Sequence, residues 1–176
     1  AALFMVDTDD FKMINDNYGH IVGDMVLTAM ADGMKAIMRK HDIVGRIGGD
    51  EFMVFMKDIS CADDAVKKAK ELTEMFDHLF EDEKNSVSVS SSIGIAVFPG
   101  NGETFKNLYS NADRALYQVK KLGKNSYMLY DDISAESVLD NKYFTPRTRI
   151  ESENNASNVS RDLLGYIFEI DRESVV

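Results

Sequence analysis

Cysteine and long apolar runs are both nearly absent from this sequence. The single cysteine, Cys61, excludes an internal disulfide and fits the reducing cytoplasm. No apolar run approaches the roughly 20 residues of a membrane-spanning helix, and no basic-then-apolar leader opens the chain. We therefore expect a cytoplasmic chain, either free or as the cytoplasmic part of a membrane-anchored protein.

Basic residues are scarce as well. The 176 residues include 20 Lys and Arg against 30 Asp and Glu, which gives a formal net charge of -10 at pH 7. This balance excludes a general nucleic-acid-binding protein, because such a protein presents a basic face to the phosphates. A phosphate-bearing ligand would have to be bound locally, by a few cations, backbone amides or a metal ion.

Apolar residues recur with strand or helix spacing through most of the chain. Runs bounded by turn residues predict strands at residues 2–6, 43–47, 52–56, 87–97 (interrupted at 90–92) and 127–130. Helical spacing predicts helices at residues 25–38, 60–79 and 105–119. The second helix would have Ser60 as its N-cap, with Asp63 three residues later. This order predicts an α/β (α+β) fold of the ferredoxin-like or polymerase-palm kind, a mixed sheet with its helices mainly on one face.

The composition changes after Asp132. Residues 133–160 are rich in Ser, Asn, Asp and Glu and have few large apolar side chains, which predicts a polar linker. Residues 161–176 contain a new apolar run between Leu163 and Ile170, which predicts either a helix that docks back or the start of a following domain. We therefore expect one folded domain over residues 1–132.

Three acidic residues, Asp7, Asp9 and Asp10, directly follow the first predicted strand. Taken alone, they are typical of a solvated acidic turn. A second acidic pair, Asp50 and Glu51, follows on a hairpin that the same sheet could place beside the first group. Carboxylates from separate strands repel each other unless a cation lies between them, and oxygen ligands favour Mg²⁺ or Mn²⁺. The pattern predicts a metal site.

Two glycines, Gly48 and Gly49, precede the second acidic pair. A Gly-Gly pair in a hairpin is usually just a turn. Here it also removes two side chains next to the carboxylates, so that the backbone can approach a bulky ligand closely. Phosphate-binding turns require such an approach.

Two segments carry recognisable motifs: residues 48–52 read Gly-Gly-Asp-Glu-Phe, and residues 7–24 fit the pattern D-x-D-x-F-K-x-I-N-D-x-x-G-H-x-x-G-D at every fixed position. Both resemble the GGDEF family of bacterial diguanylate cyclases, of which the pentapeptide is the defining signature. Residues 92–95 and 112–117 are similar to two later family blocks, so the resemblance covers about residues 1–130. It implies a palm fold related to nucleotidyl cyclases, and an enzyme that condenses two GTP into cyclic di-GMP and two pyrophosphates.

The resemblance implies catalytic and metal-binding roles for particular residues. Mg²⁺ or Mn²⁺ would be bound by Asp7, the backbone carbonyl of Thr8, and Asp50. Asp50 is also the expected base for the attacking hydroxyl, and Glu51 would support the metal site and Lys12. Which of the two hairpin carboxylates takes the proton stays open at this point.

The resemblance also implies the substrate contacts. Guanine would be bound by Asn15 and Asp24, a role that suits an aspartate because it accepts from the N1–H and N2–H₂ groups, a donor pair that adenine lacks. His20 is expected at the rim of the pocket. The remaining contacts would come from Phe11, Gly48 and Gly49 and, for the triphosphate, from Lys12, Lys120 and Lys124. The family generally has arginine at the position of Lys124, so a point charge replaces a bidentate group here.

Assembly and control follow from the same resemblance. Family members act as homodimers with half of the site in each subunit, so a monomer should be inactive. Arg39 and Asp42 form an Arg-x-x-Asp motif that five residues separate from Gly48, the spacing of the family's inhibitory site for cyclic di-GMP. The bare motif is weak, and its offset from the signature carries the prediction of product inhibition. Linked sensory or effector domains are expected outside this segment, and no nucleic-acid partner is expected.

Three other interpretations stay open. A degenerate family member would bind GTP or cyclic di-GMP and report to a partner without catalysis, although such members usually lose signature residues that this chain keeps. A palm of another class, such as a polymerase or an adenylyl cyclase, does not require the guanine-binding pair together with the pentapeptide. A structural dimerisation domain leaves the clustered acids unexplained. The family's opening helix, with its D-x-L-T-G-L-x-N-R block, does not precede Ala1, and we expect the chain to begin inside a longer protein.

Overall fold

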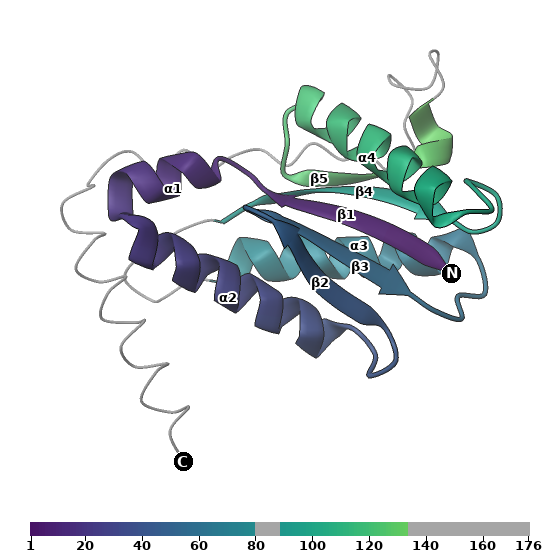
Figure 1. Ribbon diagram of the computed structural model, residues 1–176, viewed down its shortest axis with the longest axis horizontal. Coiled ribbons are helices and arrows are strands. Elements are labelled where there is room, and N and C mark those ends of the chain that lie inside the picture. Colours follow the sequence, from purple (N-terminus) through teal and green to yellow (C-terminus); the bar gives the residue numbers. More distant parts are fainter. Residues whose placement is uncertain (80–88, 134–176) are drawn as a thin grey trace.

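A computed structural model describes residues 1–79 and 89–133, which form one five-stranded sheet covered by helices (Figure 1). The strands are β1 (Ala2–Thr8), β2 (Ile43–Gly48), β3 (Glu51–Met56), β4 (Ser91–Val97) and β5 (Ser126–Leu129). The helices are α1 (Phe11–Tyr18), α2 (His20–Ile37), α3 (Ala62–His78), α4 (Phe105–Lys121) and the short 3-10 helix η1 (Tyr130–Ile133). Nearly all of the expected linker and the whole C-terminal segment lie outside the described residues.

β1 lies at the centre of the sheet, whose strand order is β2-β3-β1-β4-β5. It pairs antiparallel with both β3 and β4, whereas β4 and β5 are parallel. Every residue of β1 is buried, because strands flank both of its edges and helices cover both faces. The predicted α/β fold with a mixed central sheet is confirmed.

The two faces of β1 pack against different helices. Phe4 belongs to a core shared with α2 and α3, whereas Leu3 and Met5 pack against α4. The expectation that the helices lie mainly on one face is therefore wrong for α4, which covers the opposite face (Figure 1). Its packing requires Gly94 in β4, because a Cβ there would come within 2.1 Å of the Ala112 carbonyl oxygen.

The first helical region begins earlier than predicted. α1 was not predicted at all, and α2 begins at His20 rather than at residue 25. Phe11, Ile14 and Tyr18, spaced three and four residues apart, pack on the core, yet none of them is fully buried. A short and half-buried helix gives a weak apolar stripe, which is why the pattern alone did not reveal it.

The serine run that was predicted to interrupt a strand lies partly within β4. Ser91 and Ser92 are buried and pair with Thr8 and Asp7 of β1. Their hydroxyl groups lie in the interior of the sheet, so small polar residues here reflect burial beside β1 rather than a loop.

The N-terminus of α3 is shifted by one residue from the prediction. Cys61 rather than Ser60 is the N-cap, and the acidic partner is Asp64 rather than Asp63. The Asp64 carboxylate accepts the backbone N–H groups of Ser60 and Cys61 at 2.8 and 3.3 Å. Within residues 1–79 and 89–133, no helix combines the length and the apolar character that crossing a membrane requires.

Candidate active site

The end of β1, the β2–β3 turn and α1 lie at the same end of the sheet (Figure 1). Asp7 near the end of β1 lies opposite Glu51 at the start of β3. On the other strand edge of β1 it lies opposite Ser92. The strand register therefore brings together acidic residues that are more than 40 positions apart in the sequence, as the motif analysis predicted.

Asp7 is a buried carboxylate that forms an ion pair with a lysine side chain. Its side chain is 10% exposed, and Lys120 of α4 places Nζ 2.7 Å from Asp7 Oδ2. Burial raises the pKa of the Asp7 carboxyl above its ordinary value; Lys120 opposes this effect, and the charges of Asp50 and Asp9 add to it. The ionised carboxylate is thus incompletely compensated by Lys120 alone, and a further cation would stabilise it.

The β2–β3 turn is clamped to the end of β1. The backbone carbonyl of Asp50 accepts both the N–H and the hydroxyl of Thr8, each at 3.2 Å. Gly49 has a positive φ of 44°, which the tight turn requires. Arg46 was not among the predicted site residues, yet its Nε donates to the Gly49 carbonyl oxygen at 2.8 Å. An arginine inside a strand, two residues before the glycine pair, gives no distinctive sequence signal.

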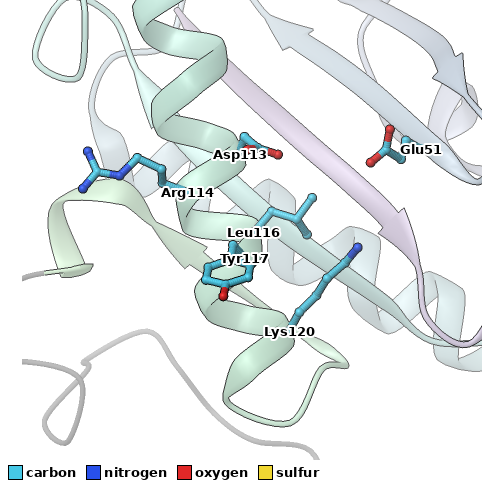
Figure 2. Close-up of a pocket in the computed structure, with 6 residues that line it drawn as sticks. All are labelled: Glu51, Asp113, Arg114, Leu116, Tyr117 and Lys120. Carbon is cyan, nitrogen blue, oxygen red and sulfur yellow. The ribbon is translucent and has the colours of Figure 1, made fainter.

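A shallow pocket of about 260 Å³ opens between β3 and α4 (Figure 2). Glu51 forms one wall, and Lys120 and Asp113 extend from α4 towards it. Arg114 points away and donates to the Tyr130 hydroxyl at 3.1 Å. The other lining residues are Leu116 and Tyr117. Sequence reasoning found Glu51 and Lys120 but missed the rest, whose only signal was their position in one family block.

The expected guanine ligands lie on α1 and α2. Asn15 lies on α1, and its Oδ1 is buried without a hydrogen-bond partner among the described residues. A Cβ at Gly23 would come within 2.0 Å of that oxygen, so the glycine makes the space that the Asn15 side chain occupies. Asp24 and His20 are exposed on α2. A buried acceptor without a donor is costly, which is consistent with a ligand that donates to Asn15.

The three expected triphosphate lysines differ in their surroundings. Lys12 is exposed on α1, near Phe11, which is half-buried at the start of that helix. Lys120 pairs with Asp7, and Lys124 pairs with Asp10 at 2.7 Å. The lysines of α4 and its following turn are thus held at the acidic end of β1 by the carboxylates there.

The residues present suit a hard cation. Asp7 and Asp50 supply two carboxylates whose charges interact, and the expected third donor, the Thr8 carbonyl, is also oxygen. Across the described part of the chain, no three His, Cys, Asp or Glu side chains gather into a metal-binding cluster. Any metal bound here would therefore take further ligands from water or from substrate phosphates, as Mg²⁺ commonly does.

The sequence model of the family described as "Diguanylate cyclase, GGDEF domain" matches residues 1–126. The chain belongs to the GGDEF family. Among curated relatives, this GGDEF domain is 40% identical over 131 residues to the bifunctional diguanylate cyclase/cyclic di-GMP phosphodiesterase MucR of Pseudomonas aeruginosa, covering 74% of this chain and 19% of MucR. It is 36% identical over 129 residues to diguanylate cyclase TpbB of the same species, covering 73% of this chain and 30% of TpbB. The chain thus spans under a third of either relative.

Solved structures resemble the GGDEF domain in fold as well. The crystal structure of the GGDEF domain of TpbB matches with a TM-score of 0.68 and 35% identity, covering 73% of this chain and 80% of that one. The GGDEF domain of DgcB from Caulobacter crescentus, solved in complex with cyclic di-GMP, matches with a TM-score of 0.64 and 26% identity, covering 74% of this chain and 77% of that one.

The Arg39–Asp42 turn of the GGDEF domain lies at the opposite end of the β2–β3 ribbon from the signature turn. A hollow of about 250 Å³ there is lined by Lys35, Met38, Arg39, Lys40, Asp42 and Val44. The Asp42 side chain is only 1% exposed. Its two oxygens accept the backbone N–H groups of Arg39 at 3.0 Å and Lys57 at 2.9 Å. Both predicted residues thus line this hollow. The Asp42 oxygens already accept two backbone amides, and the predicted role of the pair in binding cyclic di-GMP stays a prediction.

Proposed function

We propose that this GGDEF domain is a diguanylate cyclase that condenses two GTP molecules into cyclic di-GMP and releases two pyrophosphates. The observation that carries the proposal is the convergence of Asp7, Glu51 and Lys120 at one end of the sheet, with Asp50 close enough to raise the pKa of Asp7. This arrangement suits a phosphate-bearing substrate in an otherwise acidic chain. The family relationship supports the same activity.

The reaction requires the 3′-hydroxyl of one GTP to attack the α-phosphorus of the other and then the reverse, with pyrophosphate leaving each time. Asp50, on the β2–β3 turn, is the proposed base that accepts the hydroxyl proton, and the neighbouring Glu51 lines the pocket between β3 and α4. Lys120 and Lys124 would neutralise the triphosphate. Mg²⁺ or Mn²⁺, held by Asp7, Asp50 and the Thr8 carbonyl, would stabilise the charge that develops on the phosphates.

Selectivity for guanine is proposed to come from α1 and α2. The buried Asn15 Oδ1 would accept from the base, and the exposed Asp24 carboxylate would accept from N1–H and N2–H₂. Adenine has no matching donor pair, so ATP would leave these acceptors without partners. His20 would lie at the rim, because it is exposed at the first residue of α2.

Each domain is proposed to hold one GTP, so that catalysis requires a homodimer, and the wider protein would couple this dimer to linked sensory or effector domains. The hollow at Arg39 and Asp42 is the proposed inhibitory site for cyclic di-GMP, since Lys35, Arg39 and Lys40 are among the residues that line it. Arg39→Ala should relieve product inhibition while synthesis is retained. Unchanged product inhibition in this variant would contradict the assignment of the inhibitory site.

The decisive experiment is incubation of the chain with GTP and Mg²⁺, followed by chromatography for cyclic di-GMP. Asp50→Ala should abolish the product, and Asp32→Ala, which removes an exposed carboxylate of α2, should not. A folded dimer that binds GTP without forming product would favour the regulatory-module interpretation instead. Turnover of ATP at the same rate as GTP would contradict the guanine assignment.

A further inference from the structure

Asp9 and Asp10 are the two acidic residues after β1 to which the proposed chemistry assigns no role, and Asp9 is the more deeply buried of the two. It is 5% exposed and lies two residues beyond Asp7. Its carboxylate accepts three hydrogen bonds: from the Ser92 hydroxyl at 2.6 Å, the Ser90 hydroxyl at 2.9 Å and the backbone N–H of Asn125 at 2.9 Å. All three donors are more than 80 positions away in the sequence.

The Asn125 contact reaches the turn between α4 and β5. Lys124 and Asn125 both have left-handed backbone conformations, with φ of 63° and 45°. Two successive residues other than glycine rarely adopt this conformation without support from neighbouring groups. Asp9 supplies that support at the Asn125 amide, and the adjacent Asp10 holds the Lys124 ammonium group at 2.7 Å.

We propose that Asp9 is a positioning residue that holds the Lys124–Asn125 turn so that Lys124 lies over the triphosphate site. This inference rests on the proposed function. Both oxygens of Asp9 already accept hydrogen bonds from protein donors. Asp7 differs, because among the described residues its carboxylate pairs only with the Lys120 side chain. Asp9 acts through the turn rather than through a metal ion.

The variant Asp9→Asn distinguishes a residue that positions the turn from a residue that binds a metal ion. An asparagine oxygen can accept the Asn125 N–H while its amide group donates to a serine hydroxyl, which also accepts. The positioning role is therefore largely kept in Asp9→Asn, whereas Asp9→Ala removes it. A metal ligand would behave differently, because a neutral amide is a poor substitute for a carboxylate on Mg²⁺.

The first measurement is amide hydrogen exchange of Asn125 in the ligand-free chain. Asp9→Ala should abolish protection of this amide, and Asp9→Asn should retain most of it. This measurement does not depend on catalysis, so it decides whether Asp9 holds the turn even if the chain makes no cyclic di-GMP. Unchanged protection in Asp9→Ala would overturn the proposal.

The second measurement is the Kd for an α,β-methylene analogue of GTP, which cannot be cyclised. Asp9→Ala should weaken binding about tenfold, the effect of losing one charge-assisted phosphate contact. In a Lys124→Ala background the same change should weaken binding no further, because the turn would then position nothing. The proposal would be overturned if the losses of affinity from the two substitutions added up in the double variant. It would also be overturned if Asp9→Ala abolished protection of the Asn125 amide while the Kd stayed constant.

Two further variants guard against a misfolded Asp9→Ala. The double variant Ser90→Ala, Ser92→Ala removes two donors to Asp9 and should weaken analogue binding several-fold. Ser91→Ala is its matched control, because this hydroxyl is buried without a partner among the described residues, and it should leave binding unchanged. The Mg²⁺ concentration for half-maximal activity should not move in Asp9→Asn; a large increase would assign Asp9 to the metal instead.

Discussion

Acidic residues lie at both ends of the β2–β3 ribbon, but their buried carboxylates differ in how fully neighbouring groups compensate the charge. At the signature end, Asp7 is buried beside the charges of Asp50 and Asp9, and Lys120 compensates it only in part. At the far end, Asp42 is more deeply buried, yet its two oxygens accept the Arg39 and Lys57 amides.

The difference separates carboxylates that stabilise the fold from carboxylates that are available to a ligand. A buried carboxylate with backbone amide donors lowers the free energy of the folded state, whereas crowded carboxylates raise it until a cation binds. Substitutions at the two ends should therefore have opposite effects on stability and activity.

The largest effect is expected for Asp7→Asn. Cyclic di-GMP formation should fall by roughly 100-fold or more, because the substitution removes a proposed metal ligand. The Tm of the ligand-free chain should rise at neutral pH. Folding raises the pKa of Asp7. The Asp7 carboxyl therefore contributes fully to stability at a pH below its ordinary pKa, and this contribution is lost as the pH rises through its raised pKa in the folded chain. Product chromatography and thermal unfolding at pH 7 measure both quantities. A lower Tm would mean that the Asp7–Lys120 pair outweighs the burial of the charge.

The next largest effect concerns the other end of the ribbon. Asp42→Ala should lower the free energy of unfolding by about 2–4 kcal/mol, because two backbone amides lose a charged acceptor. Arg39→Ala at the same turn should leave it within about 0.5 kcal/mol, since the Arg39 side chain is not the donor to Asp42. Urea unfolding checks both. Equal stability of the two variants would show that Asp42 is as free for a ligand as Arg39.

A smaller effect is expected at the boundary between α1 and α2. Gly23→Ala should raise the KM for GTP about tenfold by displacing Asn15, the proposed guanine acceptor. Gly45→Ala in β2 is the matched control, because a Cβ there meets nothing within 4 Å. Steady-state kinetics with GTP test the pair. An unchanged KM in Gly23→Ala would exclude a role for the present position of Asn15.

The smallest effect tests a third carboxylate, Asp64, which resembles Asp42 in accepting backbone amides. The hydrogen bonds from Ser60 and Cys61 hold the pKa of Asp64 below its ordinary value. Asp64 thus contributes to stability at a pH above its ordinary pKa, and this contribution is lost as the pH falls through its lowered pKa in the folded chain.

Asp64→Asn should accordingly lower the Tm slightly at pH 7, and the difference from the parent chain should vanish in acid. Thr104→Ala is a suitable comparison, because it removes an uncharged cap of α4 that accepts from the Asn107 amide at 3.2 Å. Its Tm deficit should be independent of pH. Thermal unfolding as a function of pH measures both, and a pH-independent deficit in Asp64→Asn would contradict the charged cap.

Most of the sheet and the long helices could be predicted from local patterns. The strands around Phe4 and Phe52 and the stripe of α4 follow directly from apolar spacing. The predictions of secondary structure were wrong where the local sequence pattern was weak and tertiary packing determined the element. Examples are the buried Ser91 and Ser92 in β4 and the half-buried α1.

By itself, the sequence determined the family and the fold class and supplied candidate site residues, because these are carried by short motifs and apolar periodicity. The tertiary structure alone decided how each acidic residue is used. Asp7, Asp9 and Asp10 are near neighbours in the chain, yet one faces Lys120, one accepts from both a serine pair and the Asn125 amide, and one holds Lys124. The physical reason is that the charge and hydrogen-bond partners of a buried carboxylate come from strands and turns distant in sequence, which no local pattern specifies.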